Sequence, residues 1–148
     1  GQAKQSNYGM AISARDQTEI HVVGDVTGAS TKGRIETGED GQKTSYYVGI
    51  VYATADSVVE IEGSVWGSDS KQGYASIIAQ AYDNAKIHIT GNGVTGAGPW
   101  GAYGAIAGDA GSIVIDGNLC FCINDQSSSS ADVIRGDVTI GGILINQP

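Results

Sequence analysis

Four copies of one seven-residue motif constrain the fold of this chain more than any other feature of its sequence. The copies end on glycine and read TEIHVVG, SVVEIEG, AKIHITG and GSIVIDG, at 18–24, 57–63, 85–91 and 111–117. In each copy an aliphatic residue stands four positions before the glycine and another stands two positions before it, as Val59 and Ile61 do before Gly63. Apolar residues at every second position are typical of a strand with one buried face. The copies therefore predict four equivalent strands.

The repeating unit extends beyond this strand on both sides. Ten residues before each closing glycine stands an alanine, which predicts an earlier strand: Ala14, Ala53, Ala81 and Ala107. Between the two strands lies a turn position that is usually aspartate, a residue that favours turns: Asp16, Ala55, Asp83 and Asp109. A third strand is predicted after the glycine, starting at Val26, Val65 and Leu119.

Such units cannot bury an apolar face alone, and stacking them in parallel aligns their aliphatic residues into continuous internal ladders. We therefore expect residues 1–148 to form a single all-β domain, a right-handed parallel β-helix (β-solenoid) of about five coils. The handedness follows the general preference of parallel crossover connections. The sequence VIRGDV aligns as a truncated fifth copy on Gly136, and the unequal spacing of the copies places insertions at one variable corner. Residues 29–45, rich in Gly, Ser, Thr and charge, are predicted to form a long exposed loop.

Composition excludes several classes of partner. The formal charge of −8 argues against nucleic acid or an anionic membrane surface, because both attract basic proteins. No apolar run approaches the roughly 20 residues of a membrane-spanning helix. The start at Gly1 suggests a piece of a larger repeat protein.

Cys120 and Cys122 are expected to be free thiols, because residues two apart in a strand lie about 6.5 to 7 Å apart, at the limit of disulfide geometry.

Two stretches carry a resemblance to a known family. Residues 53–63 and 24–28 resemble the units of right-handed parallel β-helix proteins, in particular bacterial adhesins and autotransporter passenger domains that are secreted or attached to the cell wall. The residues that match are Ala53, Ala55, Ser57, Val59, Ile61 and Gly63, together with 24–28. The resemblance implies an extracellular or cell-surface location and a structural or adhesive role, and it assigns no catalytic residue.

One row of outward residues combines imidazole and carboxylate. If the aliphatic ladders face inward, the residues three before each glycine face outward, and stacking places His21, Glu60 and His88 about one strand spacing apart. These groups suit Zn²⁺ or a similar ion. The alternative is an ordinary cross-strand row in which Glu60 supports the two histidines electrostatically.

Aromatic residues gather near the variable corner. They are Trp66, Tyr74, Trp100 and Tyr103. Exposed rings side by side would stack on sugars, and loops at one edge of a solenoid are where binding usually develops. The alternative is that the rings cover the ends of the core beneath the loops.

Two further motifs have structural explanations. The tripeptide 135–137, Arg-Gly-Asp, is aligned with 23–25 of the first unit, where glycine and aspartate serve a turn, so its match to a cell-attachment motif is taken as coincidence. The segment 37–42 (TGEDGQ) concentrates acidic residues without the alternating oxygen ligands of a calcium loop, which predicts a solvated loop tip.

The sequence therefore predicts a non-catalytic structural or adhesive domain of a bacterial extracellular or cell-surface protein, without a cofactor. Its expected partner is a glycan or a host surface protein, and its open coil ends allow end-to-end self-association. The alternative is a carbohydrate-binding or polysaccharide-processing β-helix domain. An ice-binding solenoid is a further alternative, disfavoured because the outward rows lack a regular threonine array.

Overall fold

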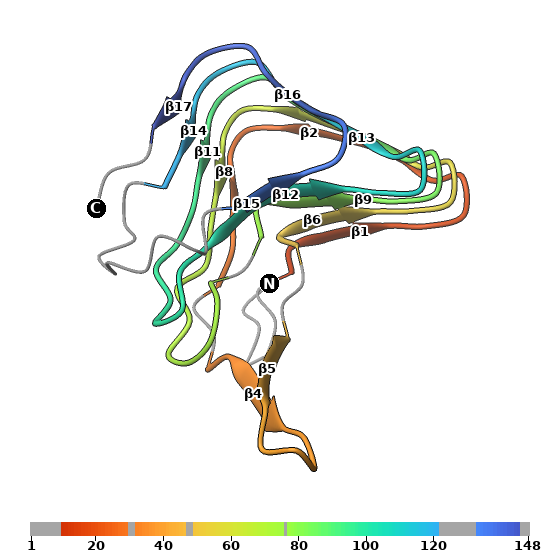
Figure 1. Ribbon diagram of the computed structural model, residues 1–148. Coiled ribbons are helices and arrows are strands. Elements are labelled where there is room, and N and C mark those ends of the chain that lie inside the picture. Colours follow the sequence, from red (N-terminus) through yellow and green to blue (C-terminus); the bar gives the residue numbers. More distant parts are fainter. Residues whose placement is uncertain (1–9, 30–31, 47–48, 76, 122–132, 146–148) are drawn as a thin grey trace.

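The chain folds as a parallel β-helix of five coils in a computed structural model (Figure 1). The structure describes residues 10–29, 32–46, 49–75, 77–121 and 133–145. These residues form 17 strands and no helix, so none of them belongs to a helix that could cross a membrane. The all-β solenoid architecture predicted from the repeats is thereby confirmed.

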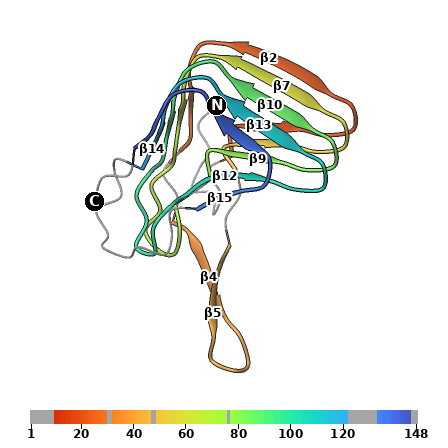
Figure 2. The same ribbon diagram turned by 45° about the horizontal axis from the view of Figure 1, so that its top comes forward.

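Three parallel sheets of five strands each form the walls of the solenoid. Sheet A consists of β1 (Ile12–Ala14), β6 (Val51–Ala53), β9 (Ala79–Ala81), β12 (Tyr103–Ala107) and β15 (Val133–Arg135). Sheet B consists of β2 (Glu19–Val23), β7 (Val58–Glu62), β10 (Lys86–Ile89), β13 (Ser112–Ile115) and β16 (Val138–Ile140). Sheet C consists of β3 (Val26–Thr27), β8 (Val65–Trp66), β11 (Gly93–Val94), β14 (Leu119–Cys120) and β17 (Leu144–Ile145). Each coil contributes one strand to each sheet, and Figure 2 shows the coils stacked in chain order.

The predicted ladders form the core. The alanines of sheet A pair in register: Ala14, Ala53, Ala81 and Ala107. Sheet B contributes one ladder of Ile20, Val59, Ile87, Ile113 and Val138 and a second of Val22, Ile61, Ile89, Ile115 and Ile140. The sheet B residues of the three middle coils are essentially fully buried, whereas those of the first and last coils are only partly buried. End coils have a neighbour on one side only, so their apolar faces are incompletely covered.

The turn between sheets A and B has the same unusual backbone in four coils. Two successive residues adopt positive φ angles, as do Asp83 (φ 52°) and Asn84 (φ 62°) in the third coil. Asp and Asn tolerate this left-handed conformation better than most residues. Thr54 Oγ1 of the preceding coil also donates a hydrogen bond of 3.0 Å to Asp83 Oδ2. The aspartates that recur in the sequence are therefore explained by backbone geometry.

A polar ladder links the coils at the corner between sheets B and C. Along this corner a side-chain oxygen of one coil accepts a hydrogen bond from a backbone N–H of the next coil. The bonds join Asp25 to Ser64 (2.8 Å), Ser64 to Asn92 (2.9 Å), Asn92 to Asn118 (2.8 Å) and Asn118 to Ile143 (2.9 Å). The ladder supplies partners to N–H groups that the strands leave unpaired at the corner.

The closing glycines are required by the close approach of successive coils. A Cβ atom on Gly63 would lie 2.2 Å from the carbonyl oxygen of Gly24, the equivalent residue of the preceding coil. Any larger residue would push the two coils apart at this corner. This contact explains why the motif ends on glycine.

The alignment of the fifth copy on Gly136 is wrong. Val138 and Ile140 continue the two sheet B ladders, and the N–H of Gly142 bonds the carbonyl of Gly117, so Gly142 is the closing glycine. Only Gly136 and Asp137 separate β15 from β16, whereas the fourth coil has a longer turn between β12 and β13. The shortened turn displaced the sequence pattern and led to the wrong alignment.

The insertion at 29–45 is more ordered than the predicted loop. It contains an antiparallel hairpin of β4 (Arg34–Thr37) and β5 (Lys43–Tyr46), which stands away from the solenoid in Figures 1 and 2. Gln72 Nε2 donates a 3.0 Å hydrogen bond to the carbonyl of Gly33 at its base. Ile35 is the only aliphatic residue in the two short strands, so they lack the alternation of aliphatic residues by which a strand is predicted.

The expectation of free thiols is also wrong for Cys120. This residue is disulfide-bonded, and the described part of the chain contains no free cysteine. Strand β14 ends at Cys120, so the extended spacing assumed for the two cysteines does not continue as a strand beyond it. The only other cysteine of the sequence, Cys122, lies outside the described residues.

Candidate functional site

The outward row on sheet B has the predicted register. His21 of β2 pairs with Glu60 of β7, Glu60 pairs with His88 of β10, and His88 pairs with Val114 of β13. The same strands direct their aliphatic residues into the core, so these four residues occupy the outer face. The prediction that stacking brings both histidines beside Glu60 is confirmed at the level of the backbone.

The two histidine side chains pair with carboxylates that lie outside this row. His88 Nε2 lies 2.8 Å from Asp116 Oδ2, and His21 Nε2 lies 3.3 Å from Glu62 Oε2. Both pairs are about half exposed, with side-chain exposures between 41% and 57%. Each histidine therefore pairs with a carboxylate of the following coil, His21 with Glu62 and His88 with Asp116.

A three-residue cluster forms at the first two coils. One ligand atom each from His21, Glu60 and Glu62 lies within 4.8 Å of the other two, an arrangement that could hold a metal ion. It differs from the predicted trio because Glu62 takes the place of His88. The sequence contained the signal for Glu62, which stands two residues after Glu60 and therefore projects from the same face of the strand.

Three of the four predicted aromatic residues pack together. The Tyr74 ring lies 5.5 Å from the Trp100 ring in an edge-to-face arrangement, and 4.7 Å from the Tyr103 ring. Tyr103 is buried, and the other two are partly buried. Edge-to-face packing covers part of each ring and stabilises the loops above the core. The geometry of this cluster favours the covering role over an open platform for sugars.

Trp66 lies apart from these three, on the outer face of sheet C. Its side chain is 43% exposed, while its neighbour Val65 points into the core. Thr27 of β3 and Val94 of β11 pair with Trp66 on either side. Trp66 is therefore partly exposed on the outer face of this sheet, between Thr27 and Val94.

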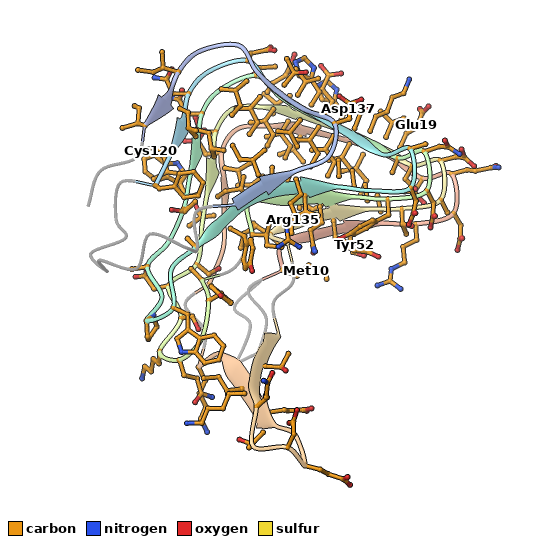
Figure 3. All side chains as sticks on the ribbon, in the orientation of Figure 1. Met10, Glu19, Tyr52, Cys120, Arg135 and Asp137 are labelled. Atoms are coloured by element: carbon orange, nitrogen blue, oxygen red, sulfur yellow. The ribbon has the colours of Figure 1, made fainter. Side chains whose placement is uncertain are left out.

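The Arg-Gly-Asp tripeptide lies at the tight turn between β15 and β16, not at the position equivalent to 23–25. Arg135 is the last residue of β15 and Asp137 immediately precedes β16, and both are labelled in Figure 3. The Arg135 guanidinium lies over the Tyr103 ring, 5.9 Å from its centroid. The Asp137 carbonyl accepts a bond from Ile113 N (3.0 Å), and a Cβ on Gly136 would lie 1.8 Å from the Ala107 carbonyl oxygen. The glycine and the turn are thus explained by coil packing.

The acidic tip of the hairpin closes on itself. Asp40 Oδ1 accepts a hydrogen bond of 3.0 Å from Gln42 N, and Gly38 N donates to the carbonyl of Gln42 at 2.7 Å. The residues from Gly38 to Gln42 are all exposed. The Asp40 carboxylate is therefore used to form the turn, in agreement with the predicted solvated tip.

Comparisons of the chain with protein-family models, with curated proteins and with solved structures found no significant match. The resemblance to bacterial adhesins and autotransporter passengers stays a prediction. The functional proposals below rest on the geometry of the described residues.

Proposed function

We propose that this domain is a non-catalytic structural and adhesive module of a bacterial extracellular or cell-surface protein. The main observation in support is that five coils form a continuous rod, while the β4–β5 hairpin projects from it. The core ladders run through successive coils, while the β4–β5 hairpin lies outside all three sheets. A rigid repeat scaffold with variable insertions is a common way to hold recognition elements at a distance from their anchor.

The proposal assigns no catalytic residue. The ionisable pairs that the structure brings together on sheet B lie on an open face, half exposed to solvent. Acid–base catalysis gains most from sites that exclude water and hold their groups in a fixed geometry. Open pairs of this kind support a binding or structural role more than a catalytic one.

End-to-end contact between copies is part of the same proposal. Each sheet ends on an edge strand, which is β1, β2 or β3 at one end of the solenoid and β15, β16 or β17 at the other. Leu144 (53% exposed) and Ile143 (63% exposed) add apolar surface at the second end. Open edges next to apolar surface favour pairing with another strand. If the chain is part of a longer protein, flanking coils would pair with the same edge strands that a second copy would otherwise occupy.

Carbohydrate binding is the second candidate function, and the exposed ring of Trp66 favours it. Trp66 is partly exposed between the paired residues Thr27 and Val94, and an exposed tryptophan ring offers apolar surface on which a sugar ring can stack. On this candidate the site is on sheet C and not at the Tyr74 cluster. Polysaccharide processing would additionally require product release from a bound glycan.

The test compares a hairpin deletion with two tryptophan variants. In the deletion, residues 34–46 are replaced by a short Gly-Ser linker, which leaves all three sheets intact. Adhesion of coated beads to host epithelial cells is expected to fall in the deletion, with thermal stability unchanged. Unchanged adhesion, or no adhesion by the wild type, would contradict the adhesive proposal.

A glycan array separates the second candidate from the first. Binding that is lost in Trp66→Ala and retained in Trp100→Ala would support the sheet C site. Binding that is lost only in Trp100→Ala would place a site at the aromatic cluster instead. Release of sugar products from a bound glycan would establish processing and contradict the non-catalytic assignment.

A further inference from the structure

We propose that His21, Glu60 and Glu62 form a binding site for a divalent transition-metal ion, for which Zn²⁺ is the appropriate probe. The site lies on the outer face of sheet B, across strands β2 and β7. It is independent of the adhesive and carbohydrate proposals, because it involves neither the hairpin nor Trp66.

The backbone fixes the relative positions of the three residues. His21 and Glu60 are paired in the parallel ladder, and Glu62 follows two residues later on the same face of β7. Neighbouring strands pair through their edges, so a further coil beside β2 would leave this face open. The site is thus built on two paired strands of a rigid sheet, which hold its ligands more precisely than a loop would.

The distances fit a tetrahedral ion with little movement. Two ligand atoms on tetrahedral zinc lie about 3.4 Å apart when each bond is about 2.05 Å. His21 Nε2 and Glu62 Oε2 are 3.3 Å apart, close to that value. The third ligand atom, from Glu60, is within 4.8 Å of both. A side-chain rotation that moves the Glu60 carboxylate oxygen by up to about 1.4 Å completes three corners of the tetrahedron and leaves the fourth for water.

The charge of the cluster also favours a cation. Two carboxylates share the site with a single imidazole, so the cluster is negative in either ionisation state of the ring. Within the described residues Glu60 has no hydrogen bond or ion pair, because the two histidines beside it pair with Glu62 and Asp116. A divalent cation offsets the repulsion between the two carboxylates and supplies the partner that Glu60 lacks.

The donor set selects among cations. An imidazole nitrogen with two carboxylate oxygens suits Zn²⁺, Cu²⁺ and Ni²⁺. Ca²⁺ prefers six to eight oxygen ligands, and Mg²⁺ demands near-ideal octahedral oxygen coordination. Binding of Zn²⁺ in preference to Mg²⁺ is therefore the signature of a site that uses His21.

The same face carries a natural control. His88 and Asp116 form a pair at 2.8 Å two coils further along, about half exposed like the first pair. Among the described residues, only the His21 cluster brings three suitable ligands together. A pair with two protein ligands binds zinc more weakly than a trio, so substitutions at His88 and Asp116 control for general surface effects.

The experiment is calorimetric titration of the whole chain with zinc chloride at neutral pH, after removal of any purification tag that contains histidine. The wild type is expected to bind one ion per chain at this site. His21→Ala, Glu60→Gln and Glu62→Gln are each expected to lower the affinity about tenfold or more, the scale on which zinc sites respond to lost interactions. His88→Ala and Asp116→Asn are expected to leave the affinity within about twofold, because the side chains of His88 and Asp116 pair with each other and not with the three ligands. Circular dichroism and the melting temperature establish that each variant is folded.

The imidazole nitrogens give a second readout that does not depend on any variant. In a long-range ¹H–¹⁵N spectrum, added zinc is expected to shift the Nε2 resonance of His21 and not that of His88. The proposal is overturned if the wild type binds no zinc, if binding survives His21→Ala, or if His88→Ala weakens it equally. Mg²⁺ binding as tight as that of Zn²⁺ would also overturn it.

Discussion

Replacement of one core isoleucine in the middle of the solenoid tests the ladder architecture directly. Ile87 of β10 is 1% exposed and is stacked between Val59 of the preceding coil and Ile113 of the following one. Ile87→Ala removes three carbon atoms from this enclosed position and leaves a cavity that two flanking coils hold open. Substitutions of this kind cost about 2–5 kcal/mol of unfolding free energy. We expect a value near the middle of that range, about 3 kcal/mol.

Ile20→Ala makes the same chemical change in the same ladder, at the first coil. Ile20 is only partly buried, and within the described residues its ladder neighbour is Val59 alone. Part of the removed surface is already in contact with water, and the space that it leaves is open on one side. The transfer and cavity contributions both shrink, so we expect a cost of about 1 kcal/mol.

Urea unfolding followed by circular dichroism measures both values, and a thermal scan provides a second estimate. About 3 kcal/mol corresponds to a fall in melting temperature of roughly 6–12 °C for a chain of this size, against roughly 2–4 °C for the first-coil variant. Equal losses in the two variants, or a larger loss for Ile20→Ala, would refute the argument. Such a result would mean that the first coil is as enclosed as the third.

Three further predictions concern the polar ladder, the turn at Gly136 and the bonding of Cys120. Asn92→Ala removes a side-chain acceptor from the polar ladder and should lower the unfolding free energy by about 1 kcal/mol in urea titrations, whereas the exposed Lys86→Ala should change it by less than about 0.5 kcal/mol. Gly136→Ala introduces a Cβ 1.8 Å from a carbonyl oxygen at a residue with φ +78°, so hydrogen exchange should accelerate in β16 while β7 stays protected; uniform protection would contradict this. A thiol reagent should detect no free cysteine in the unfolded chain until a reductant is added, and a stoichiometric reaction before reduction would contradict the bonding of Cys120.

The sequence was sufficient to predict the core because each core position is occupied by the same kind of residue in successive coils. The alternation around Val59 and Ile61 identified the buried face of sheet B, and the distant alanine of each unit identified the strand of sheet A. Parallel stacking then fixed which residues pair. Register in a half-buried strand is strongly specified, since a slip by one residue would expose every apolar side chain.

The insertion and the fifth coil escaped prediction for a common physical reason. Both depend on a local turn and not on the repeat. The hairpin of β4 and β5 is held by its own antiparallel pairing and contains a single aliphatic residue, Ile35. The two-residue turn at Gly136 removed the aspartate position by which the other coils could be aligned. A repeat pattern of buried residues cannot detect strands that lie outside the core. It also cannot detect turns between strands that have been shortened.

The candidate metal site shows where sequence reasoning ends on the surface of a solenoid. Strand periodicity and stacking placed His21, Glu60 and His88 in one row, and the backbone agrees. On a parallel sheet, however, each outward side chain has a directly paired neighbour at about 4.8 Å and diagonal neighbours at about 7–8 Å, which long side chains can still reach. Long side chains such as Glu62 reach either one, so rotamers decide the partner, and the difference in energy is small. A bound cation would shift that balance by drawing Glu60 and Glu62 onto the same ion as His21, which makes zinc itself the most direct probe of how this face is organised.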